Sequence, residues 1–172
     1  LAPLMLEIAA WGSTSLSWLT APPAGAMAQA KELLEYLNAT AEGVITTHGL
    51  AMYALGTHPR LAHLLLEGHR LGFGNLAADI AALLAELRLD VLNSWRKKQG
   101  SSGADTTTLK RLDQLAASYR DKLPKTSNRQ NTAYLVGRLI ALAYPERIAQ
   151  RRENSRERYK LANGRGVKLP QY

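Results

Sequence analysis

The feature that most constrains the fold of this chain is the spacing of its apolar residues, which follows the period of an α-helix along most of its 172 residues. Two stripes show it, the first made of Met27, Ala30, Leu33, Leu34 and Leu37 and the second of Leu76, Ile80, Leu83, Leu84 and Leu87. Steps of three, four and seven residues place side chains on one face of a helix. The sequence therefore predicts a mainly α fold in which these stripes face the core.

One stretch of the first half departs from the helical pattern. The segment NATAEGVITTHG, residues 38–49, places the pair Glu42-Gly43 before the β-branched run that ends at Thr47. Such a pair favours a tight turn between two short strands, and Thr47 is expected to cap a helix that runs to Leu55. Two helices, a ribbon and a third helix within about sixty residues are the order and size of a winged-helix-like module.

The chain after Pro59 is predicted to form a helical bundle. The expected helices are Pro59–Gly68, Asn75–Lys98, Thr107–Lys122 and Asn128–Ala143, separated by the polar breaks 100–108 and 122–128. Near the end, RYKLANGRGVKL (158–169) alternates around Asn163-Gly164, and this pattern predicts the start of a β-hairpin.

The charge of the chain is divided unevenly along its length. Residues 1–90 carry four Lys or Arg against eight Asp or Glu, whereas residues 91–172 carry 18 against six, and the net charge is +8. A basic half that follows an acidic half points to a polyanion bound on one side of the molecule. The alternative is a basic surface that only keeps the protein in solution.

The sequence offers no sign of catalytic chemistry. It lacks a G-x-x-x-x-G-K-[ST] loop, a G-x-G-x-x-G turn and an H-E-x-x-H helix, and it has no cysteine. His58, His63 and His69 are spaced so that they fall on different faces of a helix, so structural roles are expected rather than metal binding. No apolar run reaches the length of a membrane span and no signal-peptide pattern is present, so the cytoplasm is the expected location.

Several segments together resemble a known family. They are LTAPPAGAMAQAKELLEYLNATAEGVITTHGLAMYALGTHPRLAHLLL (19–66), LGFGNLAADIAALLAEL (71–87), ALAYPERIAQRR (141–152) and RYKLANGRGVKL (158–169). The first two are similar to the region that follows the motor domains of DEAH-type helicases, and the last two are similar to the bacterial branch called HrpB. The resemblance covers essentially the whole chain.

This resemblance implies three parts and a larger parent protein. The parts are a winged-helix-like domain (1–57), a helical ratchet domain (58–152) and the start of a C-terminal β domain (153–172). It also implies that two ATP-hydrolysing motor domains precede Leu1 and are partners of this region. ATP and Mg are then cofactors of the parent protein, and none is expected in the segment itself.

The function implied is an accessory region that guides nucleic acid through a helicase and is not catalytic by itself. The expected partner is single-stranded nucleic acid, with RNA as the expected kind, contacted through phosphates. The candidate binding residues are Arg96, Lys97, Lys98, Lys110, Arg111, Arg147, Arg151, Arg152, Arg156, Arg158, Lys160, Arg165 and Lys168. The alternative function is a protein-binding helical module whose basic half docks an acidic partner.

Two finer hypotheses concern the segment around Pro145. Arg147, Arg151 and Arg152 are expected to form one cluster on a helix, because positions 147 and 151 are separated by four residues. Tyr144 and Tyr159 can stack on bases, and the alternative for both is packing at a seam between domains.

Overall fold

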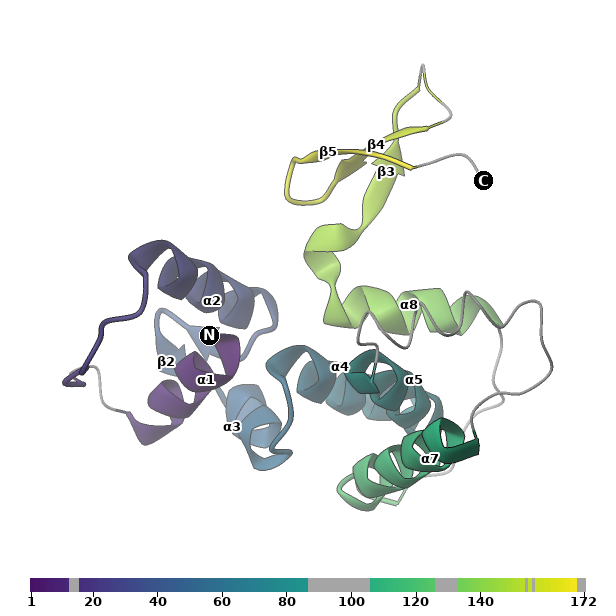
Figure 1. Ribbon diagram of the computed structural model, residues 1–172, viewed down its shortest axis with the longest axis horizontal. Helices are drawn as coiled ribbons and strands as arrows, with labels where there is room; N and C mark the ends of the chain where they lie inside the picture. Colours follow the sequence, from purple (N-terminus) through teal and green to yellow (C-terminus); the bar gives the residue numbers. More distant parts are fainter. Residues whose placement is uncertain (13–15, 87–105, 126–132, 154, 156, 170–172) are drawn as a thin grey trace.

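The mainly α fold predicted from the sequence is confirmed in a computed structural model of the chain (Figure 1). The structure describes residues 1–12, 16–86, 106–125, 133–153, 155 and 157–169. Figure 1 shows an N-terminal group of helices, a helical bundle beside it and a small sheet that stands apart from the bundle. No helix within these ranges is long and apolar enough to cross a membrane.

The N-terminal group consists of α1 (Ala2–Trp11), α2 (Ala24–Tyr36), a two-stranded ribbon and α3 (Thr47–Ala54). The first predicted stripe does face the core. Leu34 on α2 and Leu37, which directly follows that helix, are fully buried with Met52 of α3, while Leu33 packs at the edge of the same cluster. Burial of these side chains is what holds three short helices together, because helices of this length are marginal alone.

The ribbon pairs β1 (Thr40–Ala41) with β2 (Val44–Ile45), as the sequence predicted. Glu42 and Gly43 connect the strands with φ of 50° and 80°, the left-handed pair that a two-residue hairpin turn requires. The helix cap lies one residue earlier than predicted. Thr46, not Thr47, is extended, and its Oγ1 accepts a hydrogen bond of 2.9 Å from the backbone N–H of Gly49.

The bundle contains α4 (Pro59–Arg70), α5 (Gly74–Glu86), α7 (Thr106–Asp121) and α8 (Ala133–Ala143). The central helix α5 packs against the other three. Its buried face is formed largely by Ala77, Ala78 and Ala81, and the predicted core residue Leu83 is 50% exposed. Small residues form this face because α4 and α5 pack closely: a Cβ on Gly68 of α4 would lie only 2.4 Å from the Cβ of Ala77. Small residues let the helix backbones approach each other there.

Two of the predicted helices extend past the described ranges. The predicted helix from Asn75 to Lys98 is α5 as far as Glu86, and its remainder lies outside the described residues. The predicted start of the last helix at Asn128 lies outside them as well, and Leu87 of the second stripe does too.

The C-terminal part follows α8 through a 3₁₀ turn, η2 (Pro145–Arg147). It is an antiparallel sheet of β3 (Ala149–Arg151), β4 (Arg158–Leu161) and β5 (Gly166–Lys168) in the order β3-β4-β5. The hairpin predicted at Asn163-Gly164 is confirmed, with Gly164 at φ 85° between β4 and β5. The sheet begins earlier than expected, because β3 precedes residue 153, where the β domain was predicted to start.

Candidate nucleic-acid interface

The register of the C-terminal sheet gathers basic side chains on one of its faces. Lys160 lies opposite Gln150 on β3 and Gly166 on β5, and Arg158 lies opposite Lys168. Residues directly opposite each other in an antiparallel pair share a face, and so do residues two apart on one strand. Arg158, Lys160 and Lys168 therefore project from the same face, and all three are exposed.

Arg152 adds a fourth cation to this face. Its backbone N–H donates to the carbonyl of Arg158 at 3.0 Å, which continues the ladder by one residue past β3. Its guanidinium Nη2 lies 3.7 Å from the position that a Cβ on Gly166 would occupy. Gly166 thus leaves the middle of the face open, and Arg152 reaches across it toward β5. We call Arg152, Arg158, Lys160 and Lys168 the basic face.

An open concavity of about 540 Å³ lies where β3 ends and β4 begins. It is lined by Gln150, Arg151, Arg152, Glu153, Ser155, Arg158 and Lys160. Among these residues cations outnumber carboxylates four to one. The charge of Lys168 is partly compensated, because its Nζ lies 3.2 Å from the carboxylate of Glu157.

The opposite face of the sheet has a different character. Tyr159 lies between Arg151 and Val167 in the register, and Leu161 follows on the same side. Tyr159, Leu161 and Val167 are each partly buried. Tyr159 and Arg151 therefore project away from the basic face, and this second side combines three partly buried side chains with the exposed Arg151.

A bidentate ion pair anchors the start of this region to the bundle. Both terminal nitrogens of Arg60, on α4, donate to the carboxylate of Glu146, at 2.8 and 3.0 Å, and Nη1 also donates to the carbonyl of Ala143 at 2.7 Å. The two side chains are only 17% and 20% exposed. Burial raises the pKa of the Glu146 carboxyl, but the hydrogen bonds from Arg60 and the charge of Arg147 outweigh it, so the pKa lies below its usual value.

The predicted helical cluster of Arg147, Arg151 and Arg152 is wrong. Arg147 ends the 3₁₀ turn η2, Arg151 ends strand β3, and Arg152 follows that strand. Side chains alternate between faces along an extended chain, so Arg151 and Arg152 project in opposite directions. Arg147 lies over the ring of Tyr144 at 5.2 Å and within 3.7 Å of Glu146.

Tyr144 occupies a seam between α4 and the C-terminal region. Its ring carries the guanidinium of Arg60 at 4.8 Å as well as that of Arg147, and it packs at the edge of the core. These contacts are those of the seam-packing alternative. Base stacking by Tyr159 stays a prediction.

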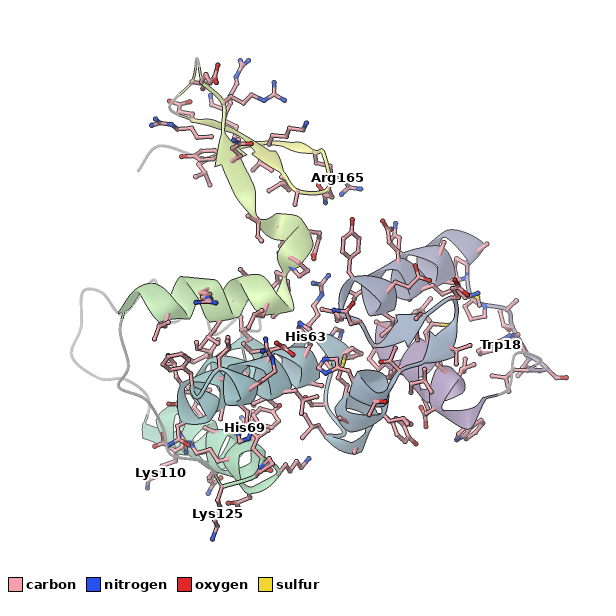
Figure 2. The ribbon with its side chains drawn as sticks, turned by 180° about the vertical axis from the view of Figure 1, so that it is seen from behind. Trp18, His63, His69, Lys110, Lys125 and Arg165 are labelled. Atoms are coloured by element: carbon pink, nitrogen blue, oxygen red, sulfur yellow. The ribbon has the colours of Figure 1, made fainter. Side chains whose placement is uncertain are left out.

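Of the other predicted cations that the structure describes, two lie on α7 and one lies in a turn of the sheet. Lys110 and Arg111 lie on α7, where Arg111 is 3.6 Å from Glu86, and Figure 2 shows Lys110 at the opposite end of the molecule from Arg165. Arg165 is exposed in the β4–β5 turn, where its backbone N–H donates to Asn163. The remaining predicted residues, Arg96, Lys97, Lys98 and Arg156, lie outside the described residues.

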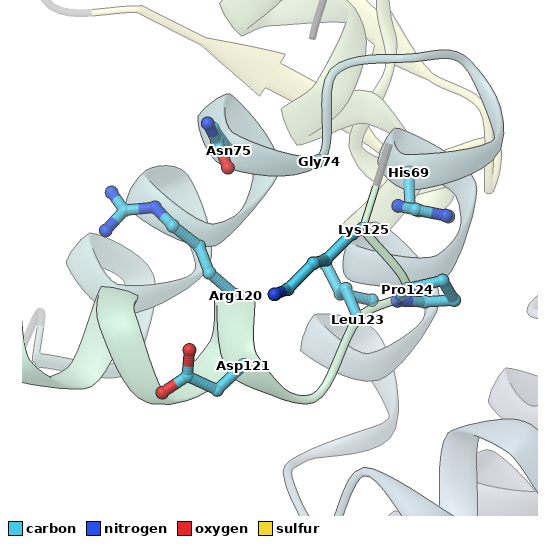
Figure 3. A pocket seen from close by; sticks show the side chains of 8 residues that line it. All are labelled: His69, Gly74, Asn75, Arg120, Asp121, Leu123, Pro124 and Lys125. Atoms are coloured by element: carbon cyan, nitrogen blue, oxygen red, sulfur yellow. The ribbon is translucent and has the colours of Figure 1, made fainter. Parts of the chain in front are cut away.

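A second hollow, of about 300 Å³, lies where α4 and α7 end and α5 begins (Figure 3). Lys125 and His69 line it, but so does Asp121, and Arg120 is ion-paired with Asp79. Its charges are therefore mixed, and it resembles a polar seam between helices more than a site for a polyanion.

The histidines predicted to have structural roles include one with a partner that the sequence did not suggest. Nδ1 of His63, on α4, lies 2.9 Å from Nε2 of His48, on α3, and the rings meet edge to face. Burial lowers the pKa of both rings, and His48 lowers that of His63 further, while Glu67 acts in the opposite direction. Among the described residues, no three His, Cys, Asp or Glu side chains are grouped so that they could hold a metal ion.

Sequence reasoning missed Arg60, Glu146 and His48. Arg60 directly follows Pro59 and is one of only four Lys or Arg residues in the first ninety positions. Its isolation in an acidic half was the available signal that it has a specific partner. That partner is 86 residues away, and spacing alone cannot identify it.

Comparison with known proteins agrees with the resemblance seen in the sequence. No protein-family model matches the chain. The ATP-dependent RNA helicase HrpB of Escherichia coli (strain K12) is 32% identical to it in an alignment of 174 positions, gaps included, that covers 98% of this chain and 20% of that protein. A crystal structure described as the E. coli DExH-box NTPase HrpB superposes with a TM-score of 0.71 at 30% identity, over 98% of this chain and 20% of the other.

A second solved structure, described as the Escherichia coli DEAH/RHA helicase HrpB, gives a TM-score of 0.68 at 30% identity over 97% of this chain and 21% of the other. The chain thus spans about a fifth of the length of the relatives it matches. The likeness in sequence and in fold extends over nearly the whole of this chain, which is therefore related to one segment of the HrpB-type DEAH helicases.

Proposed function

We propose that this chain is an accessory region of an ATP-dependent helicase that guides single-stranded RNA and does not catalyse a reaction itself. The observation that carries the proposal is the basic face of the C-terminal sheet, where Arg152, Arg158 and Lys160 are all exposed on one side. The relative that matches this chain is named an RNA helicase, which supports RNA as the nucleic acid.

The chemistry of the basic face suits a phosphate backbone. Lys and Arg bind phosphates without reading bases, and exposed cations in a row raise affinity by releasing counterions from the strand. The cations of this face come from β4, β5 and the residue after β3, so they lie side by side across neighbouring strands. Such an arrangement binds a strand of any sequence, as a helicase requires.

In this proposal the nucleotide chemistry belongs to a longer protein. ATP and Mg would bind motor domains that belong to the same parent chain. The winged-helix-like part would brace those domains, and the ratchet part would guide the strand together with the sheet. The bracing role is supported by the charge of residues 1–90, which is net negative and makes them a poor surface for phosphates.

The test is the salt dependence of binding to a fluorescent poly-U oligonucleotide, measured by anisotropy. Three variants, Arg152→Gln, Arg158→Gln and Lys160→Gln, are combined in one protein. If each residue neutralises one phosphate, the slope of log affinity against log salt becomes flatter by about 2 units, from about 0.7 per contact on a single strand. Binding to poly-A should weaken in parallel, because phosphate contacts do not select bases.

The matched control removes the same charge elsewhere, by combining Lys110→Gln, Arg111→Gln and Lys125→Gln at the other end of the molecule. Its slope should remain close to that of the unchanged protein. Equal slopes in all three proteins would contradict the proposal. No binding to any strand would favour the alternative, a helical module that docks an acidic protein.

A further inference from the structure

The strands of the C-terminal sheet pack mainly on one another within the described residues, and η2 packs on α8. Five residues, 144–148, connect the end of α8 to the start of β3. The direction in which the sheet leaves the bundle therefore depends on how this connection is held.

Arg60 holds the connection at three points. It donates to the carbonyl of Ala143 at the end of α8, to both carboxylate oxygens of Glu146 in η2, and its guanidinium lies over the ring of Tyr144. A guanidinium that binds a carboxylate through two parallel hydrogen bonds fixes an orientation as well as a distance. Lysine, with a single ammonium, cannot reproduce this geometry.

The contacts of Arg60 join two parts of the chain that lie far apart in the sequence. It lies in the first turn of α4, in the acidic half of the chain, while its partners lie 83 and 86 residues later. It is mostly shielded from solvent, so it is not placed to contact a phosphate itself. The three contacts converge on the link that carries the basic face.

We propose that Arg60 is a positioning residue for nucleic-acid binding, which sets the direction of the sheet relative to the bundle and so orients the basic face. This inference rests on the proposed function. A strand that crosses from the sheet toward the rest of a helicase needs that face held in one direction, and a preformed orientation reduces the entropy lost on binding.

The first measurement tests the orientation without nucleic acid. Because the chain has no cysteine, cysteines introduced at the exposed positions Gln114 on α7 and Ala162 after β4 can be spin-labelled selectively. Pulsed electron spin resonance should give one narrow distance distribution for the otherwise unchanged protein. Arg60→Met should broaden it, and Arg60→Lys should give an intermediate width.

The matched control is Arg70→Met on the same helix, where the arginine is also ion-paired, but with a neighbour on its own helix, Glu67, three residues before it. It should leave the distribution narrow. If Arg60→Met does not fold by circular dichroism, Glu146→Ala removes the same contact from the other side and should broaden the distribution equally. A narrow distribution in both Arg60→Met and Glu146→Ala would overturn the inference.

The second measurement uses the same variants with poly-U. Arg60→Met should weaken affinity about three- to tenfold with an unchanged salt slope, since an orientation is lost but no phosphate contact is. A flatter slope would mean that Arg60 itself contacts phosphate and would overturn the positioning role, as would an unchanged affinity. If the unchanged protein binds no strand, the proposed function fails, whereas the distance measurement still decides whether Arg60 sets the direction of the sheet.

Discussion

Replacing Gly49 with alanine should destabilise the N-terminal helices strongly, because α3 lies directly on the backbone of the ribbon. A Cβ at this position would lie 2.0 Å from the carbonyl oxygen of Ala39 and 2.8 Å from Cγ1 of Ile45. The first neighbour is backbone and cannot rotate away. An ordinary van der Waals contact begins at 3.4 Å, so α3 and the ribbon would have to move apart by more than about 1 Å.

The cost follows from two opposing terms. Overpacking of this kind costs about 1 to 3 kcal/mol or more, whereas alanine in place of glycine inside a helix gains about 0.5 to 1 kcal/mol. Because the nearest obstructing atom is backbone, the upper end of the overpacking range applies, and we expect a net loss of about 2 kcal/mol or more. For a chain of this size each kcal/mol lowers the melting temperature by about 2 to 4 °C.

The assay is urea unfolding followed by circular dichroism, with Gly137→Ala as the control. Gly137 is an exposed residue inside α8, and a Cβ there would meet nothing within 4 Å. The same exchange should then stabilise the protein by about 0.5 to 1 kcal/mol. Equal effects at the two positions, or a Gly49→Ala protein as stable as the original, would refute the packing described for α3.

Two further predictions concern the core and its pH dependence. Leu34→Ala should lower the free energy of unfolding by about 2 to 5 kcal/mol, because the side chain is only 1% exposed. Glu35→Ala, beside it on the exposed face of α2, should lower it little. Equal urea midpoints for the two variants would contradict the assignment of the stripe to the core. Burial lowers the pKa of His48 and His63, so the folded state binds fewer protons than the unfolded chain. Their stabilisation is present above pH 6.5, the ordinary value, and is lost as the pH falls below it. His48→Gln should weaken this pH dependence in unfolding at pH 7.5 and 5.5, and an unchanged dependence would show that the pair does not titrate with folding.

Local features of the fold were predictable from sequence, because they depend on neighbouring residues. The stripe ending in Leu34 and Leu37 and the turns at Glu42-Gly43 and Asn163-Gly164 all follow from spacing or from a left-handed backbone requirement. The buried face of α5 was harder to predict from the sequence. Leucine spacing favoured Leu83, whereas the close approach at Gly68 selects alanine.

The candidate site was predictable in its charge but not in its geometry. A spacing of four residues suggested a helix for Arg147 and Arg151, yet Pro145 begins only a 3₁₀ turn and the chain then pairs with residues about ten positions later. Strand pairing of that kind is a tertiary effect, and it decides which cations share a face. The contact of Arg60 with Glu146 is equally non-local, so charge counts alone could not find it.

The most direct measurement of the central claim is a titration of the isotopically labelled chain with a short oligouridylate, followed through its backbone amide resonances. We expect the largest shifts at Gln150, Lys160 and Gly166, which line one face of the sheet, with small shifts at Lys110 and Arg111 on α7. Shifts concentrated on α7, or none at any RNA concentration, would contradict a nucleic-acid interface on the C-terminal sheet.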